Sequence, residues 1–435
     1  MTRLVALALL LVAGPALAAE AREITLAEAL NLAQQNAPSA IAARGQVRTT
    51  NSGVRNAYGA FLPSVTVSAG ASRQLPSQGG QTRLDSNGQV IIIPPEPWAF
   101  TGNLGASVLL FDGGGRFFDL RQAKARASAA EANEVATQFD LELTVKQQFF
   151  DVLAERETEA AARAQLLQAG QQRTYAVARV RARTATRSDS LRAEIVVRNA
   201  QLGVTDAVDA LANSEASLTR LVGSPTLVTA SPADTVDEAP LAIGEDSLRV
   251  LANKSPAVIQ AQKALEAASA ARKSAWTDYL PAVSLGYSRG GSASGASFAP
   301  GDADYRYSGS MRLSLSLPIF NGFQRESQVT QAQVAEDNAR AQLRDTQLAA
   351  HEGLTKSLAA LRSSDERVAA QAATVEAAEE DLHVQQQRYA LGGSTLLDVL
   401  ASQTTLDQSR RDLIRARFDR RVARAQLEAL VGQDL

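Results

Sequence analysis

The motif Leu62-Pro63-Ser64-Val65 returns later in the chain as Leu280-Pro281-Ala282-Val283, at an offset of 218 residues (281 − 63). Further on, Phe111-Asp112-Gly113 returns as Phe320-Asn321-Gly322 at an offset of 209 residues (320 − 111). The first copy therefore has nine additional residues (218 − 209) between the two motifs. Because insertions accumulate in exposed loops, this difference marks a loop, and the rest of each copy is a shared framework. The sequence thus predicts an internally duplicated chain.

Each copy contains two segments in which small or polar residues alternate with apolar ones. A period of two residues is typical of β-strands that have one polar and one apolar face. We therefore expect four strands per chain, at residues 64–74, 98–111, 282–290 and 305–317.

Long helices are predicted after each strand pair. Apolar residues recur at three- and four-residue spacing, without proline, over about 118–184 and again over 323–391. Helical segments then return over about 188–222 and 395–431, so each copy ends in a helical hairpin. At 1.5 Å per residue the longer helices reach about 100 Å. Helices of this length are typical of coiled coils or tube walls rather than compact domains.

A further helix is expected before each strand pair. The first is predicted to run from Ile24 to about Tyr58, and it stops before Pro63 because the residue before a proline disfavours helical geometry. Thr25 is its expected N-cap, with Glu28 at the capping-box spacing.

These elements divide the sequence into four parts. Residues 1–19 combine a charged residue, a short apolar run and a small-residue cleavage site, which is typical of a secretory signal peptide. The Pro-rich segment 224–245 is expected to be a linker between the two structural repeats. The first repeat is residues 20–223, with its strand pair at about 64–111 and its helical hairpin at about 118–222; the second is residues 246–435, with its strand pair at about 282–317 and its hairpin at about 323–431.

Composition excludes several classes of function. The chain has no cysteine, which removes disulfides, thiolate catalysis and cysteine-based metal sites. Its formal net charge of −2 gives no reason to expect a nucleic-acid partner. The two histidines, His351 and His383, stand apart from other metal-ligating residues, and no nucleophile–base set is recognisable. We therefore expect neither an enzyme nor a bound cofactor or metal.

The strand pattern raises a problem that a single chain does not solve. Unpaired edges of a sheet are unacceptable in lipid, because their backbone groups find no hydrogen-bond partners there. Four strands are too few to close a barrel, since barrels begin at about eight strands. If one face of the alternating strands meets lipid, several chains must contribute strands to one barrel.

Four motifs occur in order along the chain: Ile24-Thr25-Leu26-x-Glu28-Ala29-Leu30, the two Leu-Pro-x-Val units, the units at 110–114 and 319–322, and Arg388-Tyr389-x-x-Gly392-x-x-Thr395-x-x-Asp398-Val399-Leu400. Together they resemble the TolC-like outer membrane efflux proteins, the exit ducts of tripartite efflux pumps and type I secretion systems. The resemblance implies an α+β membrane protein that forms a homotrimer. Four strands from each chain would build a twelve-stranded β-barrel in the outer membrane, and a periplasmic α-helical barrel would continue it.

The same resemblance implies partners and a passive mechanism. A periplasmic adaptor and an inner-membrane pump of the ABC or RND type would supply substrates and energy, outer-membrane lipid would surround the barrel, and the periplasmic helical tip would act as the gate. Two other classes remain open on the sequence: a trimeric coiled-coil stalk or adhesin, and a periplasmic adaptor with a helical hairpin.

Two aspartates are candidate pore residues. Asp398 matches a family position where an aspartate lines the closed aperture, and three copies would form an anionic ring of the kind that sets ion selectivity. Asp189 stands at the equivalent place in the first copy (398 − 189 = 209). The alternative for Asp398 is helix capping at the start of the returning helix.

The resemblance also implies a latch that holds the tip shut. Asp189 would act with Tyr389, whereas the family's arginine position is Ser394 in this chain. Arg187 or Arg183 is the possible substitute, and Gly392 is expected to adopt a positive φ in the turn. The hypothesis predicts that replacing Asp189 by Ala or Tyr389 by Phe raises the conductance of the closed duct.

Two further features are expected to have structural or docking roles. The strand-to-helix joints are predicted at Asp112, Gly113 and Gly114 in the first copy, and at Asn321 and Gly322 in the second. The turn of the first copy is rich in arginine, and these side chains form either a docking face for an acidic adaptor or a solvated helix face. They are Arg179, Arg181, Arg183, Arg187 and Arg192.

Overall fold

The structure is a computed structural model that describes residues 21–75, 81–84, 88–93, 97–232, 244–433 and 435. The predicted signal peptide, residues 1–19, lies outside the described residues, as do residues 233–243 of the predicted linker. The chain forms two compact units that cut across the two sequence repeats. The first unit contains Met1–Arg44, Asn133–Pro256 and Gln347–Leu435, and the second contains Gly45–Ala132 and Ala257–Thr346.

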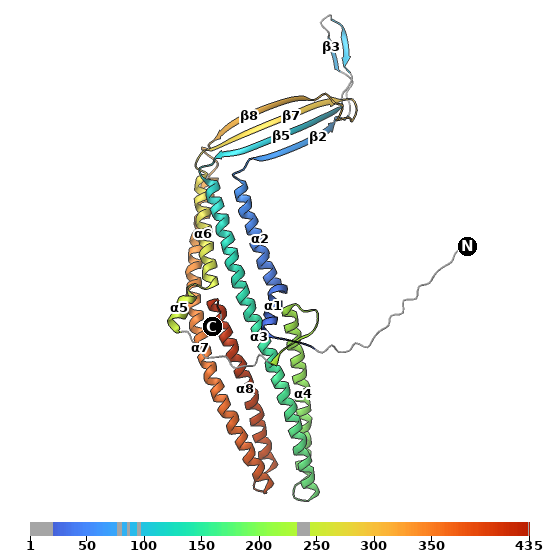
Figure 1. Ribbon diagram of the computed structural model, residues 1–435, viewed down its shortest axis with the longest axis vertical. Coiled ribbons are helices and arrows are strands. Elements are labelled where there is room, and N and C mark those ends of the chain that lie inside the picture. Colours follow the sequence, from blue (N-terminus) through green and yellow to red (C-terminus); the bar gives the residue numbers. More distant parts are fainter. Residues whose placement is uncertain (1–20, 76–80, 85–87, 94–96, 233–243, 434) are drawn as a thin grey trace, which may run out of the picture. The chain divides into compact units, whose positions relative to one another are not determined.

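The second unit contains a four-stranded antiparallel sheet with the order β2-β5-β7-β8 (Figure 1). In the first hairpin Ser64 pairs with Ser107, and in the second Ala282 pairs with Ser316. These two registers agree with the two offsets read from the sequence, 218 for the first strands (282 − 64) and 209 for the second (316 − 107). The duplication is therefore confirmed at the level of strand register. The strands are β2 (Ser64–Arg73), β5 (Trp98–Phe111), β7 (Ala282–Gly295) and β8 (Arg306–Ser316).

The two faces of this sheet differ in chemistry, as the alternation predicts. One row across the four strands contains only small or hydroxyl-bearing residues: Thr66, Gly105, Ser288 and Ser310. The next row, on the opposite face, contains Val67, Leu104, Arg289 and Gly309. Since side chains alternate along each strand, one face is polar over its whole width and the other is mainly apolar, with Arg73 and Arg289 as exceptions.

The strands differ from expectation in two places. The strand predicted at 282–290 continues to Gly295, because the Gly290-Gly291 pair that suggested an end is held in the ladder opposite Asn103 and Gly102. The loop predicted between the first two strands contains a short hairpin of β3 (Gln81–Leu84) and β4 (Val90–Ile93). This hairpin lies in the segment where the first copy has its nine additional residues.

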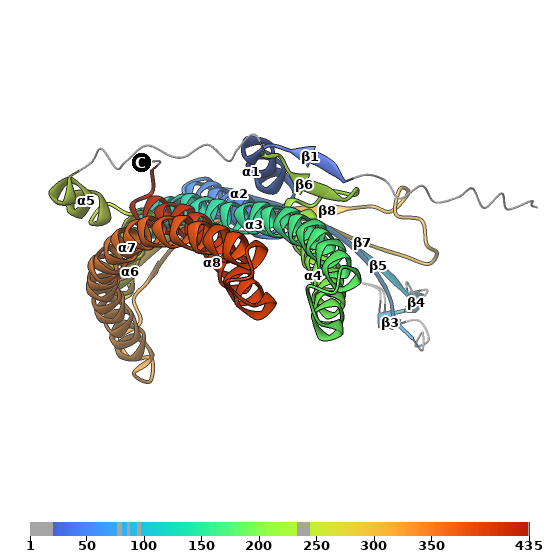
Figure 2. The same cartoon turned by 90° about the horizontal axis from the view of Figure 1, so that it is seen from below.

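Four helices in the first unit lie side by side in the order α4-α3-α8-α7, as a single curved layer (Figure 2). Ser214 of α4 donates a hydrogen bond to Asp151 of α3, Gln168 of α3 contacts Gln403 of α8, and Ser402 of α8 donates to Asp381 of α7. The long helical hairpins are confirmed, with α3 at Gly115–Arg181, α4 at Arg187–Val222, α7 at Gln324–Ala390 and α8 at Leu396–Val431.

The predicted helix from Ile24 to Tyr58 is wrong in one respect, because the chain is interrupted before Pro38. Ala37 adopts an extended conformation (φ −63, ψ 132) and separates α1 (Leu26–Asn36) from α2 (Pro38–Gly59). The residue before proline is pushed out of the helical region. Thr25 is the N-cap of α1, and its Oγ1 accepts a 3.2 Å bond from the Glu28 N–H.

Short elements around the predicted linker were not expected. Strand β1 (Arg22–Ile24) pairs in parallel with β6 (Val228–Ala230), which brings the linker against the start of the first repeat. Helix α5 (Glu245–Ala252) was also not expected, whereas α6 (Pro256–Thr277) is the helix predicted before the second strand pair. The largest apolar core of the first unit gathers around β1, β6 and the middle of α3, where Ile24, Phe149 and Val228 are almost fully buried.

Among the described residues, no helix combines the length and the apolar composition required to cross a membrane.

Candidate functional site: the helical tips and the strand-to-helix joints

At both helical turns the candidate aspartate caps the returning helix. Asp398 Oδ2 accepts bonds of 2.8 Å from both the backbone N–H and the hydroxyl of Thr395, the N-cap of α8. Asp189 Oδ2 accepts the equivalent bonds, both 2.9 Å, from Thr186 at the start of α4. Capping is therefore one role of each aspartate, in agreement with the alternative considered for Asp398.

The Asp398 carboxylate is also exposed and charged. Its pKa is lowered from the ordinary value, first by the two Thr395 donors and then by the positive charge of Arg388. An exposed carboxylate with a lowered pKa keeps its negative charge at neutral pH. The geometry thus leaves Asp398 available as a pore charge in addition to its capping role.

Tyr389 lies at the centre of a buried cluster near the turns. The Arg179 guanidinium stands over its ring, 4.4 Å from the centroid, and Arg179 Nη1 donates a 2.9 Å bond to the Tyr389 carbonyl. Tyr175 packs edge-on against the same ring at 6.3 Å. The Tyr389 hydroxyl is buried and has no hydrogen-bond partner within the described chain. Burial raises its pKa, nearby Asp189 raises it further, and the Arg179 charge opposes both.

Arg179 is thus the arginine that contacts Tyr389, whereas the sequence had suggested Arg183 or Arg187 for this role. Within the described residues neither of these two side chains has an acidic partner. Arg179 is the counterpart of Arg388 in the tip motif (388 − 179 = 209), but the offset alone does not indicate its contact with Tyr389.

The turn residues themselves have conformational roles. Gly392 has φ +78, as expected, and Arg183, its counterpart in the first copy, adopts φ +61. A side chain in this region costs roughly 1–2 kcal/mol, so the first turn is the more strained of the two. Ser394 donates a 3.2 Å bond to the Gln385 carbonyl and closes the second turn.

The first strand-to-helix joint is closed by a carboxylate–guanidinium pair. Asp112 accepts bonds from the Gly114 and Arg116 backbone N–H groups, and its Oδ2 pairs with Arg116 Nε at 3.1 Å. Arg116 also donates to the carbonyls of Leu109 and Leu110, which ties the helix start to the end of β5. Gly113 (φ +67) has Leu280 directly beside it, since a Cβ there would lie 2.6 Å from that of Leu280.

The second joint repeats this plan but is incomplete. Arg325 donates to the carbonyls of Pro318 and Ile319, at 2.7 and 3.0 Å. Asn321 replaces the aspartate, and both Asn321 Oδ1 and Arg325 Nε are buried without a hydrogen-bond partner in the described chain. Gly322 (φ +68) has no atom within 4 Å of a Cβ built on it. Arg116 and Arg325 were not singled out from the sequence, although they share the 209-residue offset.

Neither joint nor turn resembles a metal or catalytic centre. A hollow of about 410 Å³ between the two joints is lined by Asp112, Asn321 and Arg325, among others. Throughout the part of the chain that the structure describes, no three His, Cys, Asp or Glu residues are grouped so that they would hold a metal ion.

A duplicated chain with a two-faced antiparallel sheet and long helical hairpins defines the class of outer membrane channels with a helical periplasmic portion. The sequence model of the outer membrane efflux proteins matches residues 29–224 and again 248–433, one match for each repeat. The chain belongs to the outer membrane efflux protein family. It is a channel of the kind used in tripartite efflux and type I secretion systems, and not an enzyme, so the predicted family, fold and outer-membrane location are confirmed.

Individual relatives agree with this assignment. Protein CyaE of Bordetella pertussis is 26% identical over 351 residues, which cover 79% of this chain and 70% of that protein. A membrane protein from Pseudomonas aeruginosa has a similar structure, with a TM-score of 0.78 at 19% identity over 95% of this chain and 91% of that one. The outer membrane protein VceC of Vibrio cholerae gives a TM-score of 0.74 at 20% identity, covering 94% and 96% of the two chains.

Proposed function

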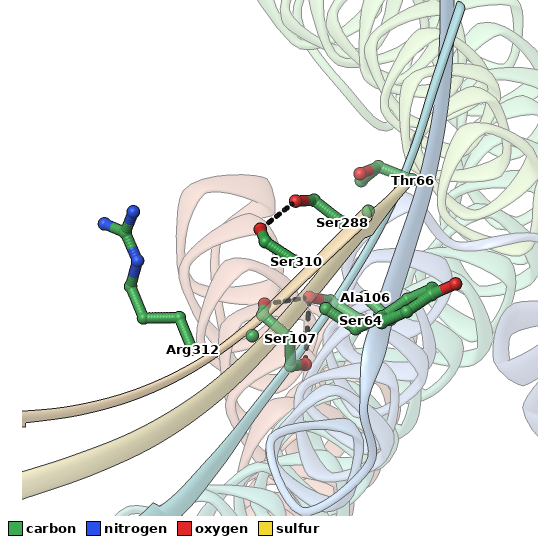
Figure 3. A pocket seen from close by; sticks show the side chains of 10 residues that line it. Ser64, Thr66, Ala106, Ser107, Ser288, Ser310 and Arg312 are labelled. Carbon is green, nitrogen blue, oxygen red and sulfur yellow. Dashed lines mark hydrogen bonds between the residues drawn. The ribbon is translucent and has the colours of Figure 1, made fainter. Parts of the chain in front are cut away.

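We propose that three copies of this chain form one duct, in which twelve strands close a barrel in the outer membrane and the helical hairpins form its periplasmic wall. The single observation that carries the proposal is the sheet with its two unpaired edges. In the part of the chain that the structure describes, strands β2 and β8 each have a partner on one side only. The polar face is hollowed by about 350 Å³ around Ser64, Ser107 and Ser288 (Figure 3). Closing such a sheet with its polar face inward gives a wet lumen and a lipid-facing apolar surface.

The duplication supplies the register of the missing contact. Inside the chain the two copies meet where Ser107 of β5 pairs with Gly286 of β7. The counterparts of these residues are Ser316 of β8 (107 + 209) and Ser68 of β2 (286 − 218), which lie on the two open edges. We infer that Ser316 of one copy pairs with Ser68 of the next. Both residues belong to the polar face, so this register keeps the two faces continuous around the barrel.

The incomplete second joint supports the same assembly. Within the chain Leu280 covers Gly113, whereas the counterpart Leu62 is 68% exposed and the counterpart Gly322 is uncovered. A second copy placed by the inferred register brings its Leu62 toward Gly322. Burial of a leucine side chain contributes roughly 1.5–3 kcal/mol. A trimer would contain three such contacts.

At the periplasmic end we propose a gate formed by Asp189, Tyr389 and Arg179, with Asp398 as an anionic ring at the aperture. The unpaired Tyr389 hydroxyl and the exposed Asp398 carboxylate support this role. Replacement of Asp189 by Ala, Tyr389 by Phe or Arg179 by Ala is expected to raise the conductance of the closed duct. Unchanged conductance in all three variants would count against the gate.

The proposed partners are a periplasmic adaptor and an inner-membrane pump of the ABC or RND type. Of the arginines near the first turn, Arg181 and Arg183 are exposed and could bind an acidic adaptor surface. Arg179 instead donates a hydrogen bond to Tyr389. Replacing Arg181 and Arg183 by Gln should weaken adaptor binding and leave the trimer intact if they dock the adaptor. Unchanged binding would make them a solvated helix face.

The proposal is tested by the mass and channel activity of the protein extracted from outer membranes in detergent. A particle of three chains with a hollow cylinder in electron micrographs, and ion conductance in planar bilayers, is the expected result. A soluble monomer, or a solid rod without conductance, would instead favour an adaptor or a stalk.

A further inference from the structure

The polar face of the sheet has an uneven charge distribution. The four strands β2, β5, β7 and β8 contain four arginines and no aspartate or glutamate. Two of these, Arg306 and Arg312, lie on β8 and belong to the polar face, since Arg306 pairs with Ser292 and Arg312 with Gly286. Arg73 and Arg289 belong to the opposite face, in the rows of Trp98 and Leu104.

Arg312 stands among hydroxyl groups rather than carboxylates. It lines the hollow together with Ser64, Ser107, Ser288 and Ser310, and its guanidinium extends away from the strands in Figure 3. The hydroxyls around it bond to one another, Ser288 to Ser310 at 3.0 Å and Ser64 to Ser107 at 2.7 Å. Its side chain is exposed, and no carboxylate pairs with it among the described residues.

Arg306 lies nearer the loop end of the same strand. Asp302 and Asp304 precede it in the exposed loop between β7 and β8, so acidic groups accompany it in sequence. Arg312, six residues further along, has no acidic residue between itself and the end of β8. Arg312 is therefore the position where the positive charge is least compensated.

We propose that Arg312, supported by Arg306, makes the β-barrel end of the duct selective for anions and for anionic segments of cargo. The proposal rests on the assembly described above, because it needs the polar face to line the lumen. Three copies would place three Arg312 guanidinium groups in one ring, with uncharged hydroxyl-bearing side chains beside them. Rings of arginine favour anions in the same way that rings of carboxylates favour cations.

This ring differs in charge from the ring proposed at the helical tip. The Asp398 carboxylates belong to the other unit of the chain and carry the opposite charge. An anion in the lumen is therefore attracted by Arg312 and repelled by Asp398.

The test uses the trimer reconstituted in planar bilayers, with inositol hexakisphosphate added on the side of the β7–β8 loops. The wild-type channel should be blocked by this polyanion. Arg312→Gln should raise the half-blocking concentration by about tenfold at low salt, because three partly screened contacts are lost. Arg312→Lys, which keeps the charge, should restore most of the block.

Arg289→Gln is the matched control, since it removes the same charge from the opposite face of the neighbouring strand. It should leave the block unchanged. Equal block of wild type and Arg312→Gln, or an equal loss in Arg289→Gln, overturns the inference while the proposed duct stands. A wild-type protein that forms trimers without conductance overturns the proposed function itself, and the inference with it.

Discussion

Helices α4 and α8 are counterparts of equal length, 36 residues each, but their surroundings differ. Helix α8 packs between α3 and α7, and residues as polar as Gln403 and Asp407 are buried in its contacts. Helix α4 packs on α3 with a row of small residues, whereas its opposite side leaves Leu191, Ile195 and Leu202 more than half exposed. The same unit of sequence is thus enclosed in one copy and open in the other.

The two strand-to-helix joints show the same contrast between an enclosed copy and an open copy. The first joint has its carboxylate, its paired arginine and its covered glycine, while the second has unpaired polar atoms and an uncovered glycine. Where the two repeats meet inside the chain the contacts are complete, and where the chain presents its outer edges they are missing. The open sites are therefore those that another copy, placed by the same repeat geometry, would complete.

The largest effect is expected from placing a charge on the open face of α4. Leu202→Asp should abolish trimer formation, because burial of an unpaired carboxylate costs several kcal/mol in each of three interfaces. Gln201→Glu, which adds the same charge at an exposed position about 100° around the helix from Leu202, should leave trimers intact. Analytical ultracentrifugation in detergent measures the difference, and trimers in both variants would show that this face is not an interface.

Substitution of the two joint glycines distinguishes contacts within the chain from contacts between copies. Gly113→Ala should destabilise the chain by several kcal/mol, since about 1–2 kcal/mol of backbone strain adds to overlap with Leu280. Gly322→Ala has the same backbone strain but free space within its own chain. It should therefore lower the temperature of trimer dissociation more than that of chain unfolding, as followed by gel mobility and circular dichroism. Equal effects on both temperatures would show that no second copy packs against Gly322.

Replacing Asp112 by Asn at the first joint and Asn321 by Asp at the second should have moderate effects on stability. Asp112→Asn removes the partner of a largely buried guanidinium, Arg116, and should cost about 2–4 kcal/mol of stability. Asn321→Asp places a carboxylate beside the unpaired Arg325 Nε and should be neutral or stabilising by about 1 kcal/mol. Thermal melts of both variants give the comparison, and a destabilising Asn321→Asp would indicate that a second copy supplies a different partner.

The smallest effect concerns Asp407, whose counterpart on the open helix is the exposed Arg198 (407 − 209). Burial raises the pKa of Asp407, against the opposing effects of its Gln403 hydrogen bond and of nearby Arg411 and Arg410. Because the pKa of Asp407 is higher in the folded state, its contribution to stability is fully present below the ordinary pKa of 3.8. This contribution is lost as the pH rises through the folded-state pKa. Asp407→Asn should therefore raise the melting temperature slightly at pH 7. The gain should vanish below about pH 3.8, whereas a gain that persists there would exclude titration of Asp407 as its cause.

Much of the fold was predictable because the duplication and the alternation are strong signals. The repeat offsets predicted the registers of the two hairpins. The proline-free segments predicted the long helices, and the observed helix ends lie within about three residues of the predicted ones. The interruption at Ala37 and the pairing of β1 with β6 were not predicted. The first was hidden by an otherwise continuous helical pattern, and the second depends on a contact between segments about 200 residues apart.

The candidate site was predictable in position more than in chemistry. Asp189 and Asp398 were located from the tip motif, and the structure adds that both cap their helices. The roles of Arg179, Arg116 and Arg325 required three-dimensional packing, because arginines are frequent in this sequence and spacing alone does not separate buried from solvated ones.

The most direct test of the assembly is a disulfide between the two open strand edges. The chain has no cysteine, so Ser68→Cys combined with Ser316→Cys provides the only thiols. Oxidation in outer membranes should produce covalent dimers and trimers on a denaturing gel, because directly opposed Cβ atoms lie about 4.5–5.5 Å apart, close to disulfide distance. Ser68→Cys with Leu315→Cys, which places the second thiol on the opposite face, should remain monomeric. Cross-linking of the control pair alone, or of neither pair, would contradict closure of the barrel in this register by copies of the same chain.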